Sequence, residues 1–149
     1  MHRRCALLAV VAATAVVALV FMRPRPGPVT FGLPPRPQVE FTLHGPDGVV
    51  LATAEGDDRA LRLTAGGFEG RAVDGRLHVG DASAALDGPA FDLGLLLAPL
   101  RRGPTRREAG HLVADGPPPT RAWVDRNGIV RRIEVDLADG SLLAVVIKG

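Results

Sequence analysis

The sequence predicts a mainly β domain of the α+β class: a curved antiparallel sheet with one short covering helix, preceded by an N-terminal transmembrane helix. Two observations predict the sheet. Apolar and polar residues alternate with a period of two through most of residues 39–149, and turn sequences containing glycine interrupt this alternation at short intervals. A third observation predicts the membrane helix, because residues 5–22 are uncharged and almost wholly apolar.

The apolar run at residues 5–22 follows Arg3 and Arg4. A helix of this length covers roughly 27 Å, which is enough for a thin hydrocarbon core. A cleaved secretory signal is the competing interpretation, but residues 19–24 are bulky and then basic where cleavage needs small residues. Residues 1–22 are therefore predicted to be an uncleaved signal-anchor that contacts the lipid bilayer.

Arginines flank both ends of this run, so charge counting does not decide its orientation. A short tail with two arginines is an ordinary secretory start. We expect a single-pass protein of the cell membrane with its body outside the cytoplasm, or a secreted protein if the N-terminal segment is cleaved.

The charge balance excludes a nucleic-acid partner. The chain has 18 basic and 16 acidic residues, and Arg3 and Arg4 account for the whole excess. The neutral remainder offers no field that would gather phosphate polyanions. Cys5 is the single cysteine, so the body can form no internal disulfide.

Residues 23–38 are predicted to be a proline-rich linker, since six of these sixteen residues are proline. Residues 39–149 then read as one exported β-rich domain, large enough for a single core. The alternation indicates roughly eight strands. Ten segments are candidates for these strands: 38–44, 49–54, 60–64, 68–73, 76–79, 82–86, 111–114, 120–124, 129–137 and 142–148.

Tight hairpin turns are expected at Asp74-Gly75, Asn127-Gly128 and Asp139-Gly140. The segment 91–102 loses the period of two and is the best candidate for a short helix, which Pro99 is expected to kink or end. Between 129 and 137 one face is apolar and the other mostly charged, which is typical of an antiparallel sheet covered on one side.

No catalytic or metal-binding pattern stands out, and we expect a non-enzymatic protein with no cofactor and no metal. The body has two serines, and Ser83 with His78 or His111 has no local support as a nucleophile and base. No paired histidine or cysteine spacing suits zinc, and Asp125-x-Asn127-Gly128 is better explained as a turn than as a calcium loop.

Three phrases occur in a recognisable order: Val73-Asp74-Gly75-Arg76-Leu77-His78-Val79, then Leu95-Leu96-Leu97-Ala98-Pro99-Leu100, then Arg121-Ala122-Trp123-Val124-Asp125-Arg126-Asn127-Gly128-Ile129-Val130-Arg131-Arg132-Ile133. This order resembles that of actinobacterial lipid-carrier lipoproteins of the LolA-like half-barrel superfamily. The resemblance implies a half-barrel curled around an apolar cavity, lidded by helices, that carries acyl chains or lipoproteins.

The chain departs from that family in three ways. It has no lipobox, a proline-rich segment replaces the usual N-terminal helix, and the body is short. The resemblance therefore bears on the fold more than on the cargo.

Two groups of residues are candidates for binding. The first would line an apolar half-barrel cleft, with an ordinary packed core as the alternative: Phe41, Leu63, Leu77, Phe91, Leu95, Leu96, Trp123 and Ile133. The second would contact a lipid headgroup or membrane surface from a loop after the helix, with a solvated loop as the alternative: Arg101, Arg102, Arg106 and Arg107.

Two functions follow from these features. The first is a membrane-anchored envelope domain that binds an acyl lipid or lipoprotein in the cleft without catalysis. The second is a cavity-free extracytoplasmic interaction or sensor module that contacts an envelope protein through a sheet edge.

Overall fold

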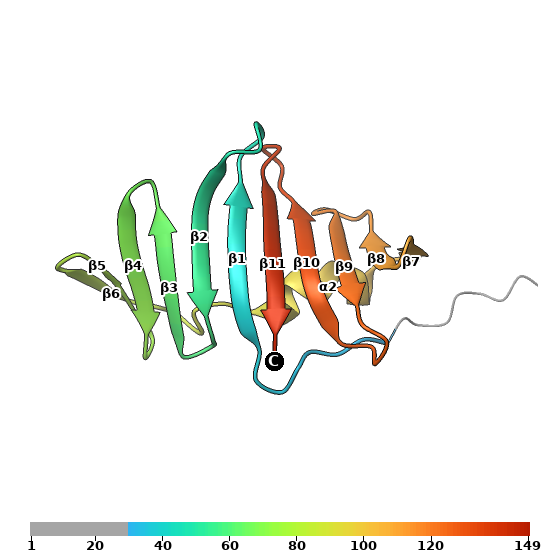
Figure 1. Ribbon diagram of the computed structural model, residues 1–149, viewed down its shortest axis with the longest axis horizontal. Coiled ribbons are helices and arrows are strands. Elements are labelled where there is room, and N and C mark those ends of the chain that lie inside the picture. Colours follow the sequence, from blue (N-terminus) through green and yellow to red (C-terminus); the bar gives the residue numbers. More distant parts are fainter. Residues whose placement is uncertain (1–29) are drawn as a thin grey trace, which may run out of the picture.

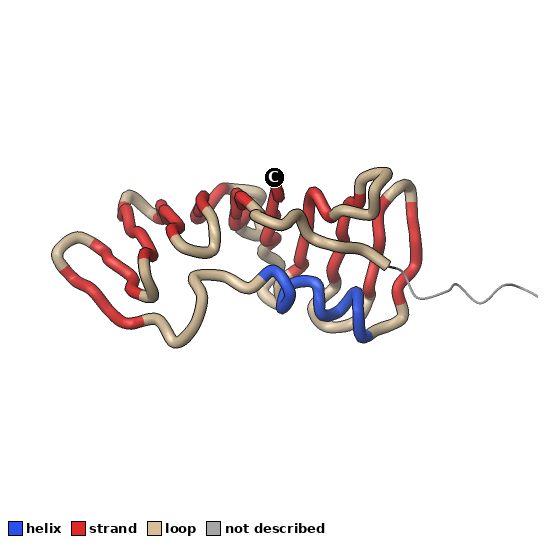
Figure 2. Tube along the Cα trace, turned by 90° about the horizontal axis from the view of Figure 1, so that it is seen from below, coloured by secondary structure: helices blue, strands red, loops and turns tan. Residues whose placement is uncertain are grey.

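The computed structural model describes residues 30–149, and the predicted membrane segment lies outside this range. Within it, eleven strands form one curved antiparallel sheet, and a single helix, α2 (Leu93–Arg102), covers part of one face (Figures 1 and 2). The mainly β prediction is confirmed at this level. Among residues 30–149 no helix is long and apolar enough to cross a membrane.

The strands form two meanders. The first contains β1 (Gln38–His44), β2 (Val50–Gly56), β3 (Ala60–Ala65), β4 (Phe68–Val73), β5 (Arg76–Val79) and β6 (Ala82–Ala85). The second follows α2 and contains β7 (Thr105–Glu108), β8 (His111–Ala114), β9 (Thr120–Val124), β10 (Val130–Asp136) and β11 (Leu142–Lys148). The first and last strands pair along their full length, from Gln38 opposite Lys148 to His44 opposite Leu142, and join the meanders.

Ten of the eleven strands correspond to candidate segments in the sequence, and β7 is the one that does not. Its residues Thr-Arg-Arg-Glu show no alternation of apolar and polar side chains. This strand lies at the edge of the sheet, where charged side chains are common. Arg106 and Arg107 consequently belong to a strand, whereas the sequence predicts a loop there.

Pro99 lies inside α2 and does not end it. The carbonyl that Pro99 leaves without its usual helical donor is that of Leu95, whose side chain is 73% exposed, so water can reach this side of the helix. Asp92 caps the N-terminus by accepting a hydrogen bond from the Leu95 backbone N–H, at 3.3 Å. The Gly103 N–H donates to the Pro99 carbonyl and closes the last turn.

Hairpin turns hold the strands in register. Asp74 and Gly75 have φ of +50° and +73° and connect Val73 to its direct partner Arg76, as the two-residue turn requires. A β-bulge between Val130 and Arg132 turns Val130 into the core, although the alternation places it on the charged face.

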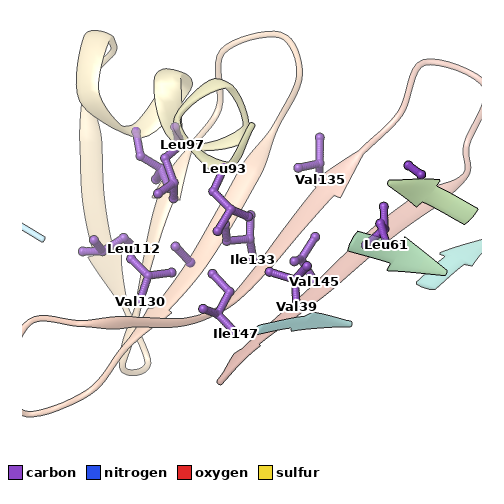
Figure 3. Close-up of a cluster of buried hydrophobic side chains, with 14 residues drawn as sticks. Val39, Leu61, Leu93, Leu97, Leu112, Val130, Ile133, Val135, Val145 and Ile147 are labelled. Atoms are coloured by element: carbon purple, nitrogen blue, oxygen red, sulfur yellow. The ribbon is translucent and has the colours of Figure 1, made fainter. Parts of the chain in front are cut away.

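The core lies between α2 and the half of the sheet formed by β8 to β11. Leu93 and Leu97 point from the helix toward Leu112, Val130 and Ile133 (Figure 3). Leu100 of the same helix is also buried in this core. The inner face, defined here as the face that carries α2, continues across the first meander, where Figure 3 shows Leu61 set apart from this cluster.

The described end of the proline-rich segment lies along the lower strand ends in Figure 1. Gly32 exchanges backbone hydrogen bonds of 2.9 Å with Gly128 and Val130, and Phe31 and Leu33 pack against the core. Residues 30–37 of the predicted linker therefore lie against the domain.

We expect Leu97→Ala to lower the free energy of unfolding by about 2–5 kcal/mol, because Leu97 is wholly buried under α2. Leu95→Ala is the matched control on the same helix. Its side chain is 73% exposed, so the same change should cost less than about 0.5 kcal/mol. Urea unfolding of both variants measures the difference, and equal losses would contradict the orientation of α2.

Acid should weaken the β9–β10 turn. The backbone N–H of Ile129 is the main cause that holds the pKa of Asp125 below its usual range; the Asn127 N–H and Arg131 guanidinium also lower this pKa, and burial opposes them. The carboxylate thus stabilises the folded state above the unfolded pKa, and this stability is lost as the pH falls through the folded pKa.

Asp125→Asn should accordingly be less stable than the wild-type chain at neutral pH and lose less stability between about pH 5 and pH 2. Urea unfolding across this pH range measures the slope. An unchanged slope in Asp125→Asn would contradict the stabilising role of the Asp125 carboxylate.

Candidate functional site

An apolar groove lies on the inner face of the first meander. The helix packs mainly on β8, β9 and β10 and does not cover the inner face of β2 to β6. That face is covered in part, since Leu61 and Ala72 are buried there and Ala90 packs against the core. Figure 2 shows both ends of the sheet bending toward the side of α2, which makes this face concave. The groove has a volume of about 270 Å³.

Small side chains on β2 and β3 leave space at the floor of the groove. Ala54 lies between Phe41 on β1 and Leu63 on β3, and Ala52 and Ala65 oppose each other one step along the same strands. The complete lining is Phe41, Leu43, Ala52, Thr53, Ala54, Leu61, Leu63, Thr64, Ala65, Ala90, Phe91 and Leu143. None of these residues is charged, so the groove can offer apolar contact and little else.

Phe91 forms one wall of the groove. It precedes the N-cap of α2, and its ring meets the Phe41 ring edge to face, with centroids 5.4 Å apart and planes at 64°. This aromatic pair ties the start of the helix to the centre of the sheet, so the groove begins where the helix-covered core ends.

The structure brings together three of the eight residues predicted for the cleft. Phe41, Leu63 and Phe91 line the groove. Leu77 lies farther out on the same face, opposite Ala72 and Ala84. Ala54 and its alanine neighbours were missed because single small residues in a strand give no distinctive sequence signal.

The other four residues lie elsewhere. Leu96 is partly buried against the core, and Ile133 is wholly buried within it. Leu95 faces solvent, because it lies on the far side of α2. Trp123 lies on the outer face, the side of the sheet away from α2, because its neighbour Ala122 occupies the inner position beside Ile133.

On the outer face Trp123 is held between two neighbours. Its ring stacks on His111 of β8, with centroids 5.0 Å apart, and the Arg132 guanidinium of β10 lies 5.1 Å from its centre. Trp123 therefore links β8, β9 and β10 on the outer face of the sheet. It cannot contact a ligand in the groove, which lies on the inner face.

The four arginines predicted to contact a headgroup do not gather in one loop. Arg101 and Arg102 form the last turn of α2, where the helix dipole favours them, and Arg101 lies 5.3 Å from the Phe31 ring centre. On β7, Arg106 pairs with Glu108 and Asp115, while Arg107 is exposed opposite Leu112. The four arginines are therefore divided between the end of α2 and the edge strand β7.

A larger hollow, of about 550 Å³, lies on the outer face over β1 to β4. Its charges are mixed: Lys148 pairs with Glu40, Arg62 lies directly opposite Glu55, and Arg71 adds one positive charge. Neither sign of charge dominates this hollow, so the smaller inner groove is the better defined binding surface.

Within residues 30–149 no group of acidic, histidine or cysteine side chains could hold a metal ion. Ser83 lies opposite His78, but its hydroxyl accepts a hydrogen bond from Arg76 at 3.0 Å. Among the described residues no hydrogen bond joins the Ser83 hydroxyl to His78, so the contact that would activate a nucleophile is missing.

No protein-family model matches the chain, and no curated protein matches it. Among solved structures, the chain is similar to the Mycobacterium tuberculosis lipoprotein LppX, with 14% identity and a TM-score of 0.41. The match covers 76% of this chain and 84% of that chain. It is a weak resemblance of fold, too low to assign a function.

We expect Phe41 and Phe91 to stabilise the domain jointly. In a double-mutant cycle with Phe41→Leu and Phe91→Leu, the coupling free energy should be about 0.5–1.5 kcal/mol, as for other edge-to-face pairs. Phe68→Leu, at an exposed hairpin position, should show no coupling to Phe41→Leu. Urea unfolding of the single and double variants gives these values, and a zero coupling would contradict the contact.

Proposed function

We propose that residues 39–149 bind an acyl chain of a lipid or lipoprotein in the inner groove, without catalysis. One observation carries the proposal: an uncharged, concave and solvent-accessible groove beside the buried core. Exposed apolar surface costs free energy in water, so a groove of this kind is better explained by an apolar ligand than by folding needs.

The size of the groove suits reversible binding of part of a chain. A volume of about 270 Å³ lies near the lower limit of small-molecule sites. Burying about six methylene groups would contribute about 5 kcal/mol, before the cost of immobilising the chain. That is weak binding, which suits a protein that must release its ligand.

The arginines at the end of α2 fit a membrane surface better than the bound lipid. The helix is ten residues long, so Arg101 and Arg102 lie about 15 Å along its axis from the start at the groove. Arg101 lies beside Phe31, near the described end of the segment that leads toward residues 5–22. We assign both arginines to headgroups of the bilayer into which residues 5–22 insert.

The remaining parts of the proposal concern location. Residues 1–22 anchor the protein in the cell membrane, residues 23–38 connect, and the domain lies outside the cytoplasm, where an envelope protein could exchange lipid with it. The eighteen-residue apolar run is the support for this arrangement. The competing hypothesis of a cavity-free interaction or sensor module does not account for the groove.

Photolabelling of the full chain in vesicles tests the proposal, with a diazirine-bearing fatty acid as the probe and peptide mass spectrometry as the readout. We expect adducts on β2 and β3, around Ala54 and Leu63, as well as on residues 5–22. Ala54→Trp should reduce the adducts on β3 at least about fivefold, because the indole fills the floor of the groove.

Labelling of residues 5–22 serves as the internal control and should not change in Ala54→Trp. Leu95→Trp adds the same side chain at an exposed position of α2 and should leave the groove adducts at the wild-type level. Adducts confined to residues 5–22 in the wild-type chain would overturn the groove as a lipid site.

A further inference from the structure

The two open edges of the sheet differ in chemistry. The edge strand β7 carries Arg106, Arg107 and Glu108, and charges of this kind discourage another strand from pairing. The opposite edge strand, β6, consists of Ala82, Ser83, Ala84 and Ala85, all exposed, with neither charge nor proline. It is an unprotected edge.

The backbone of β6 has its free hydrogen-bonding groups at defined positions. The Leu86 N–H donates to the Gly75 carbonyl at 2.8 Å, and hydrogen-bonded pairs recur at every second residue of an antiparallel ladder. Ala84 and Ala82 therefore bond to β5. Ser83 and Ala85 direct their N–H and carbonyl groups toward the open edge.

We propose that β6 pairs antiparallel with β6 of a second copy of this chain, about a two-fold axis perpendicular to the sheet. A two-fold axis perpendicular to the sheet keeps every side chain on its own face, and directly opposed residues of antiparallel strands share a face. One residue of β6 must therefore lie opposite its own copy, and the axis is named here by that residue. An axis through Ala84 would bring Asp81 against the second copy's Asp87, which repels. An axis through Ser83 places Asp81 against the second copy's Ala85.

The register through Ser83 is also complementary in charge. Arg76 lies directly opposite Ala85 on β5, and its guanidinium already reaches over β6 to the Ser83 hydroxyl, at 3.0 Å. In this register the second copy's Asp81 comes next to Ala85, about 10 Å from Arg76 across two strand spacings. The alanine methyl between them is no obstacle, so Arg76 can pair with that Asp81, twice by symmetry.

The pairing joins the inner faces of the two copies. Leu77 and Val79 on β5 and Ala82 and Ala84 on β6 lie on the inner face, and none of them is covered by α2. Across the two-fold axis they continue into the same surface of the second copy. This inference concerns assembly and does not depend on lipid binding.

Disulfide cross-linking of the full chain in detergent tests the register, in a Cys5→Ser background that removes the single native cysteine. Ser83→Cys should form a disulfide-linked dimer on mild oxidation, since opposed hydrogen-bonded residues have Cα atoms about 5.5 Å apart. Ala85→Cys is the matched control on the same strand. Its symmetry mates lie about 13 Å apart, so it should remain monomeric.

Exchanging the charges of Asp81 and Arg76 tests the pairing without changing any residue of β6. Asp81→Arg should raise the dimer dissociation constant, measured by sedimentation, at least about fivefold, and adding Arg76→Asp should restore it. Three results would each overturn the proposal: equal cross-linking of the Ser83→Cys and Ala85→Cys variants, cross-linking of the Ser83→Cys variant to another protein instead of itself, or a monomer at all concentrations.

Discussion

The pairing of β1 with β11 is the interaction on which the rest of the structure depends. Each meander is held by short hairpins of nearby residues. Within residues 30–149, the only strand pairing that joins the two meanders is this seven-residue ladder, at the centre of the sheet. Val39 and Val145 on these strands belong to the buried core beneath the joint. Without this ladder, α2 and the second meander would form a separate unit. The strands β1 to β6 would then lose β11, the neighbour that joins their inner face to the helix-covered core.

The groove is a consequence of one short helix on a wide sheet. Ten helical residues span about 15 Å, which is about three strand spacings, so α2 can cover only a fraction of eleven strands. The sequence places this helix after the first meander, and it packs on the second. The first meander therefore keeps an apolar inner face with Phe91 as the boundary between packed core and open surface.

Much of the fold could be predicted because its signals are local. The period-two alternation and the Asp-Gly and Asn-Gly turns depend only on neighbouring residues, as the β4–β5 hairpin shows. The site depends on which residues of each strand point to the inner face. A single bulge, as at Val130, changes this assignment, and a strand of charged residues such as β7 gives no alternation from which to infer it. Trp123 illustrates the limit: it is the one tryptophan in an apolar segment, but the register of β9 turns it away from the core. The predicted loop at Arg106 and Arg107 was wrong for a similar reason, since an edge strand needs no apolar residues.

The order in which the strands emerge has a consequence for folding. The partner of β1 is the last strand of the sheet, and more than a hundred residues separate Gln38 from Lys148. A chain that grows or crosses a membrane from its N-terminus can form hairpins early, but the central contact must wait for β11. Closing so long a loop is slow and costs entropy, so the contact order of this pairing delays completion of the sheet. We propose that this protein is exported. If β1 pairs with β11 only at the end, the chain can stay unfolded enough to pass through a translocation channel until its last strand has crossed.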